Sequence, residues 1–357
     1  MNELWFGELL TLLGIGLVVL LVWAALSPLE TLGWWAGWFG DEVYGYSLPQ
    51  EEVTPPIRPE PEYFVVFLSG ISRVGGETYS RRERNFLRRL SQVMPRAVVI
   101  DDIFPYSVNN LPLTGQPFFA WLWRWALRRK LSKRRLEQLA GYLINIRNIW
   151  QVAISADRRY GPIYNQSVAQ VMATALARHG YHPARRTPVI LIGYSGAGQI
   201  AVGATPYLKE LIQAPVFVVS LGGIFSSDPG LLAADHFFHL YGTRDRIHKI
   251  GAIVFPGRWP FIPWSAWNRA RREGKVTLLC IGDMTHAGAL GYLSSSARLP
   301  DGTPYLEKTA QTIAHLPYRR YLPQAQDRAR ADQQPGQGSA ESQGNGRDEL
   351  KFSPAPD

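Results

Sequence analysis

One serine of this sequence lies where a nucleophile would be presented. The stretch PVILIGYSGAGQIAVGA places Ser195 directly after a β-branched apolar run and before a helical pattern rich in glycine and alanine. A strand–serine–helix turn of this kind is typical of a nucleophile elbow, whose sharp bend requires small residues two positions before and after the serine. Gly193 and Ala197 occupy those positions, so G-x-S-x-G is matched with alanine at its end. The alternative is a glycine-rich turn that binds phosphate or only packs closely.

Two downstream loops contain the side chains that would activate this serine. A serine hydroxyl is a weak nucleophile unless a histidine, itself held by a carboxylate, removes its proton. Asp245 follows the apolar run HFFHLYG, and His286 follows the run KVTLLCIG. Because ligands and chemistry gather at the carboxyl ends of parallel strands, we expect these residues to converge with Ser195 as a catalytic triad. Asp228, in SSDPG, follows another apolar run and is the alternative acid.

The motifs GYSGAG, YGTRD and GDMTHAG together resemble those of the α/β-hydrolase superfamily, over roughly residues 63–317. The order Ser, Asp, His along the chain is the order used by that fold. The resemblance implies Ser195 as nucleophile, His286 as general base and then acid, and Asp245 as the residue that orients His286. The sequence departs from the family at Ala197 and in lacking clear antiparallel strands before residue 63.

The resemblance also implies an oxyanion hole made of two backbone N–H groups. The elbow would supply the N–H of Gly196. The loop SGIS, after the first central strand, would supply the N–H of Ile71, with Gly70 permitting the turn. A plain strand end is the alternative interpretation of SGIS.

The elements that must position these residues alternate between strands and helices. Apolar runs predict strands at 63–70, 97–101, 188–195, 215–223, 236–242 and 275–282, and helical patterns predict helices at 77–94, 165–180 and 198–213. Continuous apolar strands separated by helices indicate a buried, mostly parallel sheet. We therefore expect an α/β fold with helices on both faces of a central sheet.

The N-terminal segment predicts a membrane anchor ahead of this fold. Residues 9–29 carry no charge and are long enough to cross a bilayer as a helix. Trp34, Trp35 and Trp38 follow and suit the membrane interface. A signal peptide and a buried core helix are the alternatives, although the basic region of a signal peptide is missing. The first basic residue downstream is Arg58, which favours a single-pass protein with its domain on the cytoplasmic side.

Composition shifts divide the 357-residue chain into four parts. We predict an anchor with its interfacial tryptophans at 1–40, a proline-rich linker at 41–62, a hydrolase domain at 63–322 with a cap at about 111–160, and a disordered tail at 323–357.

The net charge of +9 admits an anionic membrane or nucleic acid as a partner. Segments 118–135 and 257–274 each combine tryptophans with basic residues. They are either solvated helix faces beside a core stripe or interfacial membrane contacts, and the tryptophans favour membrane over nucleic acid. The single cysteine, Cys280, cannot form an internal disulfide, and no metal or cofactor motif is present in the sequence. We expect no cofactor, no metal and no nucleic-acid partner.

These patterns together predict a membrane-tethered serine hydrolase, esterase-like or lipase-like, that cleaves a hydrophobic, lipid-like carboxylic ester through an acyl-enzyme. An acyltransferase or thioesterase would use the same triad. A non-catalytic membrane scaffold that retains the fold is the third alternative.

Overall fold

The computed structural model describes residues 59–72, 79–107 and 135–322, together with the single positions 7, 11, 14 and 32. Apart from those positions, the predicted anchor at 9–29 lies outside the described residues, as do most of the linker, residues 111–134 of the predicted cap and the tail. Within the described part of the chain, no helix combines the length and the apolar character needed to cross a membrane.

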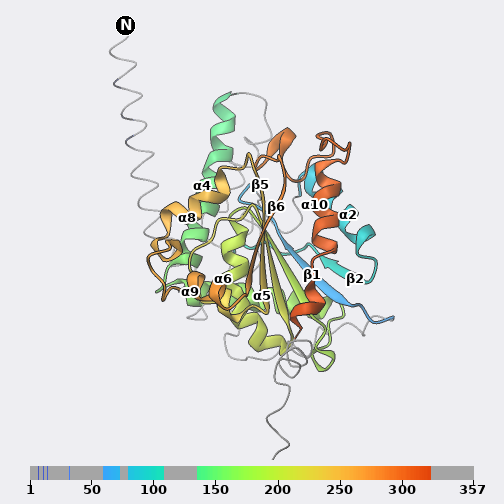
Figure 1. Ribbon diagram of the computed structural model, residues 1–357. Coiled ribbons are helices and arrows are strands. Elements are labelled where there is room, and N and C mark those ends of the chain that lie inside the picture. The colour runs from blue at the N-terminus through green and yellow to red at the C-terminus, as the bar shows by residue number, and fades with distance from the viewer. Residues whose placement is uncertain are drawn as a thin grey trace, which may run out of the picture.

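A six-stranded sheet in the order β2-β1-β3-β4-β5-β6 forms the centre of the structure, and all of its strand pairs are parallel (Figure 1). The strands are β1 (Tyr63–Leu68), β2 (Ala97–Ile100), β3 (Val189–Tyr194), β4 (Val216–Leu221), β5 (His236–Gly242) and β6 (Val276–Gly282). Each lies within or beside a run that the sequence predicts as a strand. The expected parallel α/β sheet is therefore confirmed.

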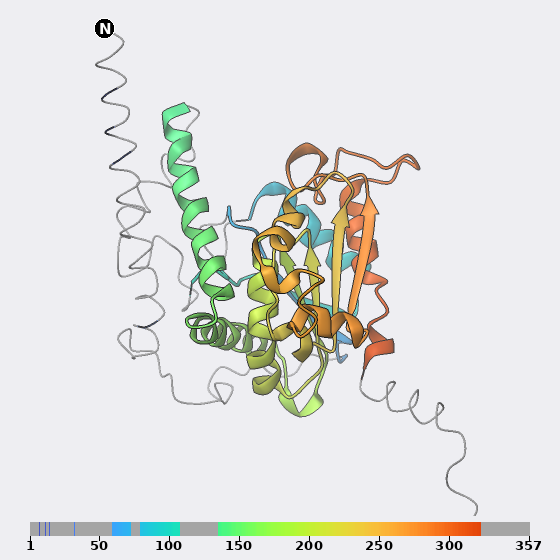
Figure 2. The same ribbon diagram turned by 60° about the vertical axis from the view of Figure 1, so that its left-hand side comes forward.

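Helices cover both faces of this sheet (Figures 1 and 2). One face is packed by α2 (Arg81–Val93) and α10 (Tyr305–Ala314). The other is packed by α4 (Arg135–Ala156), α5 (Gly161–Arg178), α6 (Ala197–Ile212), α7 (Gly230–Ala233) and α9 (Ala266–Arg272), with the short α8 (Ile250–Val254) beside α9. Single 3₁₀ turns lie at Pro183–Arg185, Ile247–Lys249, Pro256–Arg258, Gly288–Leu290 and Tyr318–Tyr321.

The strand sequences account for the two cores. Residues of one strand alternate between faces, so Val65 and Phe67 pack under α2 and α10 while Val66 packs under the opposite layer. Both faces of the central strands β1, β3 and β4 are buried, which is why these runs are almost entirely apolar instead of alternating with polar residues.

The start of α2 lies later than the sequence pattern suggests. The pattern predicts a helix from residue 77, but Ser80 is the N-cap: its side chain accepts a hydrogen bond from the Glu83 amide, and Glu83 accepts one from the Ser80 amide. This reciprocal capping box ends the preceding loop and begins the helix at Arg81.

Candidate active site

Ser195 occupies a strained turn between β3 and α6. Its φ is 57°, in the left-handed region, where a residue other than glycine costs of order 1–3 kcal/mol. Three backbone hydrogen bonds hold it there. The Ser195 amide donates to the Leu221 carbonyl at 3.1 Å, and the Ser195 carbonyl accepts from the amides of Gly198 at 3.0 Å and Ile224 at 3.1 Å. The turn is thus fixed by β4 and the loop after it as well as by its own helix.

The small residues around Ser195 are explained by close backbone approaches. A Cβ at position 193 would lie 2.6 Å from the carbonyl oxygen of Ala197, because the chain folds back on itself across the turn. A Cβ at position 198 would lie 3.0 Å from the Cα of Gly223, in the loop after β4. The glycines therefore let α6 begin directly behind the serine and pack on the sheet.

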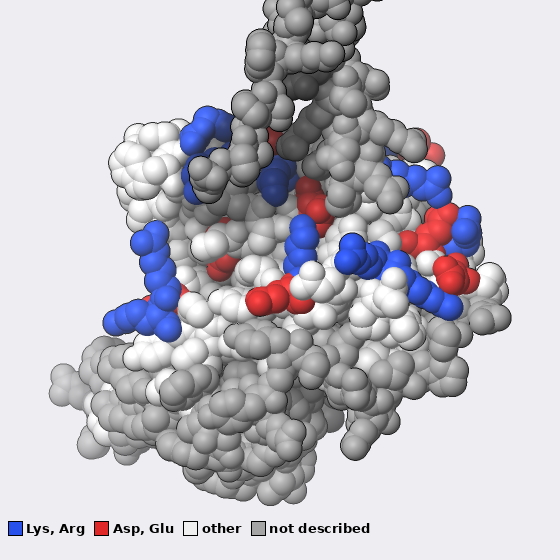
Figure 3. Space-filling view, turned by 90° about the horizontal axis from the view of Figure 1, so that it is seen from below, with Lys and Arg blue, Asp and Glu red and all other residues white. Residues whose placement is uncertain are grey.

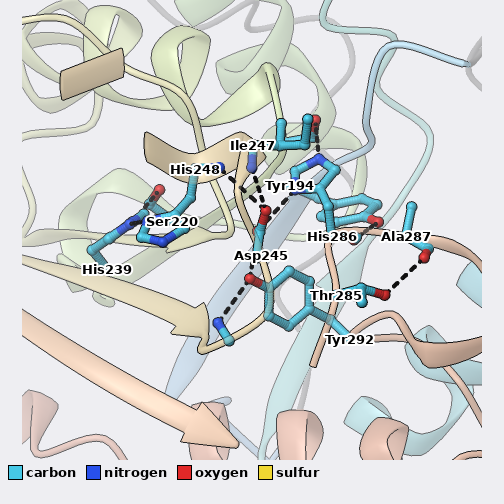
Figure 4. Close-up of polar contacts among 12 residues, drawn as sticks. Tyr194, Ser220, His239, Asp245, Ile247, His248, Thr285, His286, Ala287 and Tyr292 are labelled. Atoms are coloured by element: carbon cyan, nitrogen blue, oxygen red, sulfur yellow. Dashed lines mark hydrogen bonds and ion pairs between the residues drawn. The ribbon is translucent and has the colours of Figure 1, made fainter. Parts of the chain in front are cut away.

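His286 joins Ser195 to Asp245 through both of its ring nitrogens, and Figure 4 shows its contact with Asp245. Its Nε2 lies 2.8 Å from the Ser195 Oγ, and its Nδ1 lies 2.9 Å from Oδ2 of Asp245. Because a carboxylate can only accept, Nδ1 carries the proton and Nε2 is free to accept the serine proton. The loops after β3, β5 and β6 each contribute one of these three side chains.

Asp245 is fully buried, and four donors surround its carboxylate. Oδ1 accepts from the amides of Ile247 at 2.7 Å and His248 at 3.3 Å, while Oδ2 accepts from the Tyr292 hydroxyl at 2.6 Å and from His286. Burial acts to raise the pKa of Asp245, but the hydrogen bonds outweigh it and the net pKa lies below the ordinary value. The carboxylate therefore stays ionised beside the imidazole.

Two tyrosines that the sequence analysis did not single out hold this arrangement in place. Tyr292 receives the amide hydrogen bond of Gly242 at 2.9 Å while it donates to Asp245. Tyr194 donates from its hydroxyl to the carbonyl of His286 at 2.8 Å, and its ring stacks on the His286 ring at a centroid distance of 5.8 Å. Tyr194 is the variable residue of the elbow motif, so its position was visible in the sequence. Tyr292 follows no motif.

The loop after β1 lies against the elbow, as an oxyanion loop requires. A Cβ at position 70 would lie 3.5 Å from the Cβ of Ser195, and a Cβ at position 196 would lie 3.0 Å from Cγ2 of Ile71. Gly70 therefore lies beside Ser195, and Ile71 lies beside Gly196. Among the described residues, the amides of Gly196 and Ile71 donate no backbone hydrogen bond outside the regular helices and strands.

Buried side chains support this loop from three directions. Asn148, on α4, donates from Nδ2 to the Ile71 carbonyl at 2.7 Å. Tyr106 donates from its hydroxyl to the Ser69 carbonyl at 2.9 Å, and the Ser69 hydroxyl donates to Glu83 on α2. Since Asn148 belongs to the segment predicted as a cap, the described part of that segment reaches the site.

The other acidic candidate, Asp228, does not meet the imidazole. Its Oδ2 accepts from Nε2 of Gln199 at 3.2 Å, and its Oδ1 accepts from the amide of Gly230 at 2.8 Å, at the start of α7. Burial raises the pKa of Asp228, in contrast to Asp245. The structure therefore brings Asp245, and not Asp228, to His286.

Within the described ranges, no group of three His, Cys, Asp or Glu side chains could hold a metal ion. No protein-family model matches this sequence, and a search of curated proteins finds no relative.

Proposed function

We propose that this protein is a serine hydrolase that cleaves a hydrophobic carboxylic ester through an acyl-enzyme on Ser195. The observation that carries the proposal is the unbroken chain of hydrogen bonds from the Ser195 hydroxyl through His286 to Asp245, with the serine on a positive-φ bend. A strained turn that presents a hydroxyl to an imidazole held by a carboxylate is the arrangement that nucleophilic acyl transfer needs.

The first half of the reaction forms the acyl-enzyme. His286 Nε2 takes the proton of the Ser195 hydroxyl as Oγ attacks the ester carbonyl carbon, and Asp245 stabilises the resulting imidazolium. The negative oxygen of the tetrahedral intermediate accepts hydrogen bonds from the amides of Gly196 and Ile71. The intermediate then breaks its carbon–oxygen bond to the alcohol, which leaves with the proton that His286 returns.

The second half releases the acid. Water attacks the acyl carbon while His286 removes one of its protons, and the same two amides receive the new oxyanion. Collapse of this intermediate breaks the bond to Ser195 Oγ, which recovers its proton from His286. One ester and one water thus yield one acid and one alcohol.

The fold supports placing this chemistry in the α/β-hydrolase superfamily. The nucleophile, acid and histidine follow β3, β5 and β6 of one parallel sheet, in the chain order that this fold uses. We also propose that residues 9–29 tether the domain to the cytoplasmic side of a membrane.

Apolar side chains beside the oxyanion loop favour a hydrophobic acyl group. A Cβ at position 196 would lie 2.9 Å from Cγ2 of Val152 and 3.0 Å from Cγ2 of Ile71. These methyl groups lie beside Gly196, the residue after the nucleophile, and offer no polar atom to a substrate. A lipid-like ester is therefore the substrate class that we propose.

The test is labelling of the full chain in membranes with a fluorophosphonate, which reacts with an activated serine. We expect wild type to be labelled and Ser195→Ala to lose the label, while the matched control Ser220→Ala keeps it. Equal labelling of wild type and Ser195→Ala would refute the proposal. Esters of increasing acyl length, hydrolysed with and without a competing alcohol, then define chain length and separate hydrolysis from acyl transfer.

A further inference from the structure

The segment between Asp245 and Glu273 contains no acidic residue. Its cations are Arg246, Lys249, Arg258, Arg269, Arg271 and Arg272. Apart from Arg258, all of these residues are exposed. Arg269 pairs with Glu273, just beyond the segment, at 3.8 Å, and the segment itself contributes no carboxylate. Such a run of one sign attracts an anionic surface.

The same segment presents most of the large apolar side chains that are exposed in the described structure. Six of the nine lie here: Ile247, Ile250, Ile253, Val254, Phe261 and Trp264, which we call the 247–264 patch. Ile253 and Phe261 are 70% and 69% exposed, and Trp264 is 74% exposed. The surface of a soluble protein rarely exposes so many large apolar side chains in one segment unless that segment binds a partner.

Contacts within the segment hold α8 and the loop before α9 in a fixed arrangement. Trp259 connects α8 with the loop before α9. The Trp259 Nε1 donates to the Ala252 carbonyl at 3.0 Å, and the Trp259 ring lies 5.3 Å from the ring of Phe261. Asn268 on α9 donates from Nδ2 to the carbonyls of Trp259 at 2.7 Å and Ile262 at 2.9 Å. The backbone that carries the exposed apolar side chains is therefore fixed by hydrogen bonds.

Arg258 packs against the core and so holds the segment to it. Its guanidinium carbon lies 4.0 Å from the ring centre of Phe225 and 4.4 Å from that of Trp267. Burial lowers the pKa of Arg258 to about 10, so the side chain remains a cation at neutral pH. This contact directs Arg258 inward and leaves the remaining cations of the segment for the surface.

The amino-terminal end of the sheet differs in its charges. There Lys209 pairs with Asp235, and both Arg96 and Arg319 pair with Glu62. Figure 3, which views the molecule from below, shows Lys and Arg interspersed with Asp and Glu. Mixed charges of this kind do not favour an anionic partner, whereas the segment after Asp245 does.

We propose that the 247–264 patch is the face by which the folded domain docks on a bilayer containing anionic lipids. Aliphatic and aromatic side chains would enter the headgroup region, and the cations around them would meet lipid phosphates. Docking through this face is separate from the predicted anchor at 9–29 and requires no catalytic step.

Docking here would also bring the candidate active site to the lipid, a consequence that rests on the proposed function. The patch begins two residues after Asp245, and the amide of Ile247 itself donates to that carboxylate. A lipid ester would then have only a short path from the bilayer to Ser195.

The test measures how deeply this face enters the bilayer, using the full chain in vesicles. In a Cys280→Ser background, which removes the single cysteine, Val254→Cys is spin-labelled, and Gln311→Cys on α10, in the opposite helix layer, is the matched control. Collision of each label with oxygen, which concentrates in lipid, is compared with collision with a water-soluble nickel chelate. The vesicles contain phosphatidylcholine alone or an equal mixture with phosphatidylglycerol.

We expect the label at position 254 to favour oxygen in the anionic vesicles and the nickel chelate in the neutral ones, while the label at 311 favours the chelate in both. Each Lys or Arg near an anionic surface contributes about fivefold to binding. The pair Lys249→Gln and Arg269→Gln should therefore lower the binding constant for anionic vesicles by about 25-fold.

Three results would overturn the proposal. The first is a label at 254 that favours the chelate in anionic vesicles. The second is equal oxygen preference in neutral vesicles. The third is a label shielded from both reagents, which would mean that another segment or a second copy of the chain covers the patch. None of these results depends on catalysis, so they leave the proposed hydrolase activity untouched.

Discussion

The described part of the molecule contains two serine–histidine pairs, and only one has the surroundings of a nucleophile. Ser195 Oγ lies 2.8 Å from His286, and Ser220 Oγ lies 3.1 Å from Nδ1 of His239 (Figure 4). The first pair lies in loops beyond the carboxyl ends of strands. The second lies inside the sheet, where β4 and β5 place Ser220 and His239 in register. A hydrogen bond between hydroxyl and imidazole is therefore not the distinguishing feature.

The third member of each group makes the difference. His286 is followed by the ionised carboxylate of Asp245, whereas Nε2 of His239 faces Nδ1 of His248 at 3.2 Å. Burial, aided by the nearby positive charge of Arg258, lowers the pKa of His239 to about 3. An imidazole that resists protonation to this degree cannot hold a proton taken from serine at neutral pH. The second pair is thus suited to a structural role.

The largest contrast should come from removing each serine in turn. Ser195→Ala is expected to lower the turnover of a hydrophobic ester by roughly 10⁶-fold, because the attacking oxygen is gone. Ser220→Ala should retain wild-type turnover and lose about 1 kcal/mol of unfolding free energy, since one buried hydrogen bond is lost. Initial-rate kinetics and urea unfolding of both variants measure the two effects. If Ser220→Ala lost turnover as Ser195→Ala does, the contrast would fail.

The second contrast concerns the two candidate acids. Asp245→Asn should lower kcat by about 10⁴-fold, because the amide no longer selects the imidazole tautomer with its proton on Nδ1. Asp228→Asn is the matched change, since Asp228 bonds to Gln199 and Gly230 away from His286, and its kcat should stay near that of wild type. The reverse ranking of the two variants would move the acid's role to Asp228.

These contrasts also show which features the sequence could predict. The β-branched runs specify the strands, and the carboxyl ends of parallel strands lie at one edge, so the meeting of Ser195, Asp245 and His286 could be anticipated from their positions after three such runs. Their catalytic roles stay predictions. Burial of β6 was harder to predict, because an apolar run cannot distinguish a central strand from an edge strand. Leu278 is 47% exposed there.

Contacts that depend on the path of long loops could not be predicted. Tyr292 reaches Asp245 from 47 residues away, and Asn148 reaches Ile71 from 77 residues away. Neither side chain belongs to a motif or follows a strand, so only the folded backbone brings them to the site. The Ser220–His239 pair was equally hidden, because it depends on the register between two neighbouring strands.

The buried pair should reveal itself in the pH dependence of stability. The pKa of His239 is about 3 in the folded protein and 6.5 ordinarily, so the unfolded chain binds a proton first as the pH falls. The contribution of His239 to the unfolding free energy should therefore be fully present above pH 6.5. It should be lost as the pH falls toward 3, at up to about 1.4 kcal/mol per pH unit.

His239→Gln removes this proton uptake and should flatten the dependence, whereas His315→Gln, at an exposed position, should not. Urea unfolding at a series of pH values across this window measures the slopes. His236, whose burial lowers its pKa to about 4, contributes to all three chains alike. Identical slopes for wild type and His239→Gln would show that His239 takes up its proton in the folded state and would remove the distinction drawn between the two pairs.

The smallest expected effect sharpens the account of Asp245. Tyr292→Phe removes a hydroxyl that donates to Oδ2 and leaves the Gly242 amide without that acceptor. A hydrogen bond to a charged group contributes about 1.5 kcal/mol at the low end, so kcat/KM should fall by about tenfold. Because that bond lowers the pKa of Asp245, its loss raises the pKa, and activity on the acid side should disappear at a higher pH than in wild type.

Tyr305→Phe, which removes a hydroxyl that donates to the Asp283 carbonyl, is the matched control and should leave the pH profile in place. A uniform loss of rate with an unchanged profile would mean that Tyr292 only packs against the loop and does not tune the carboxylate.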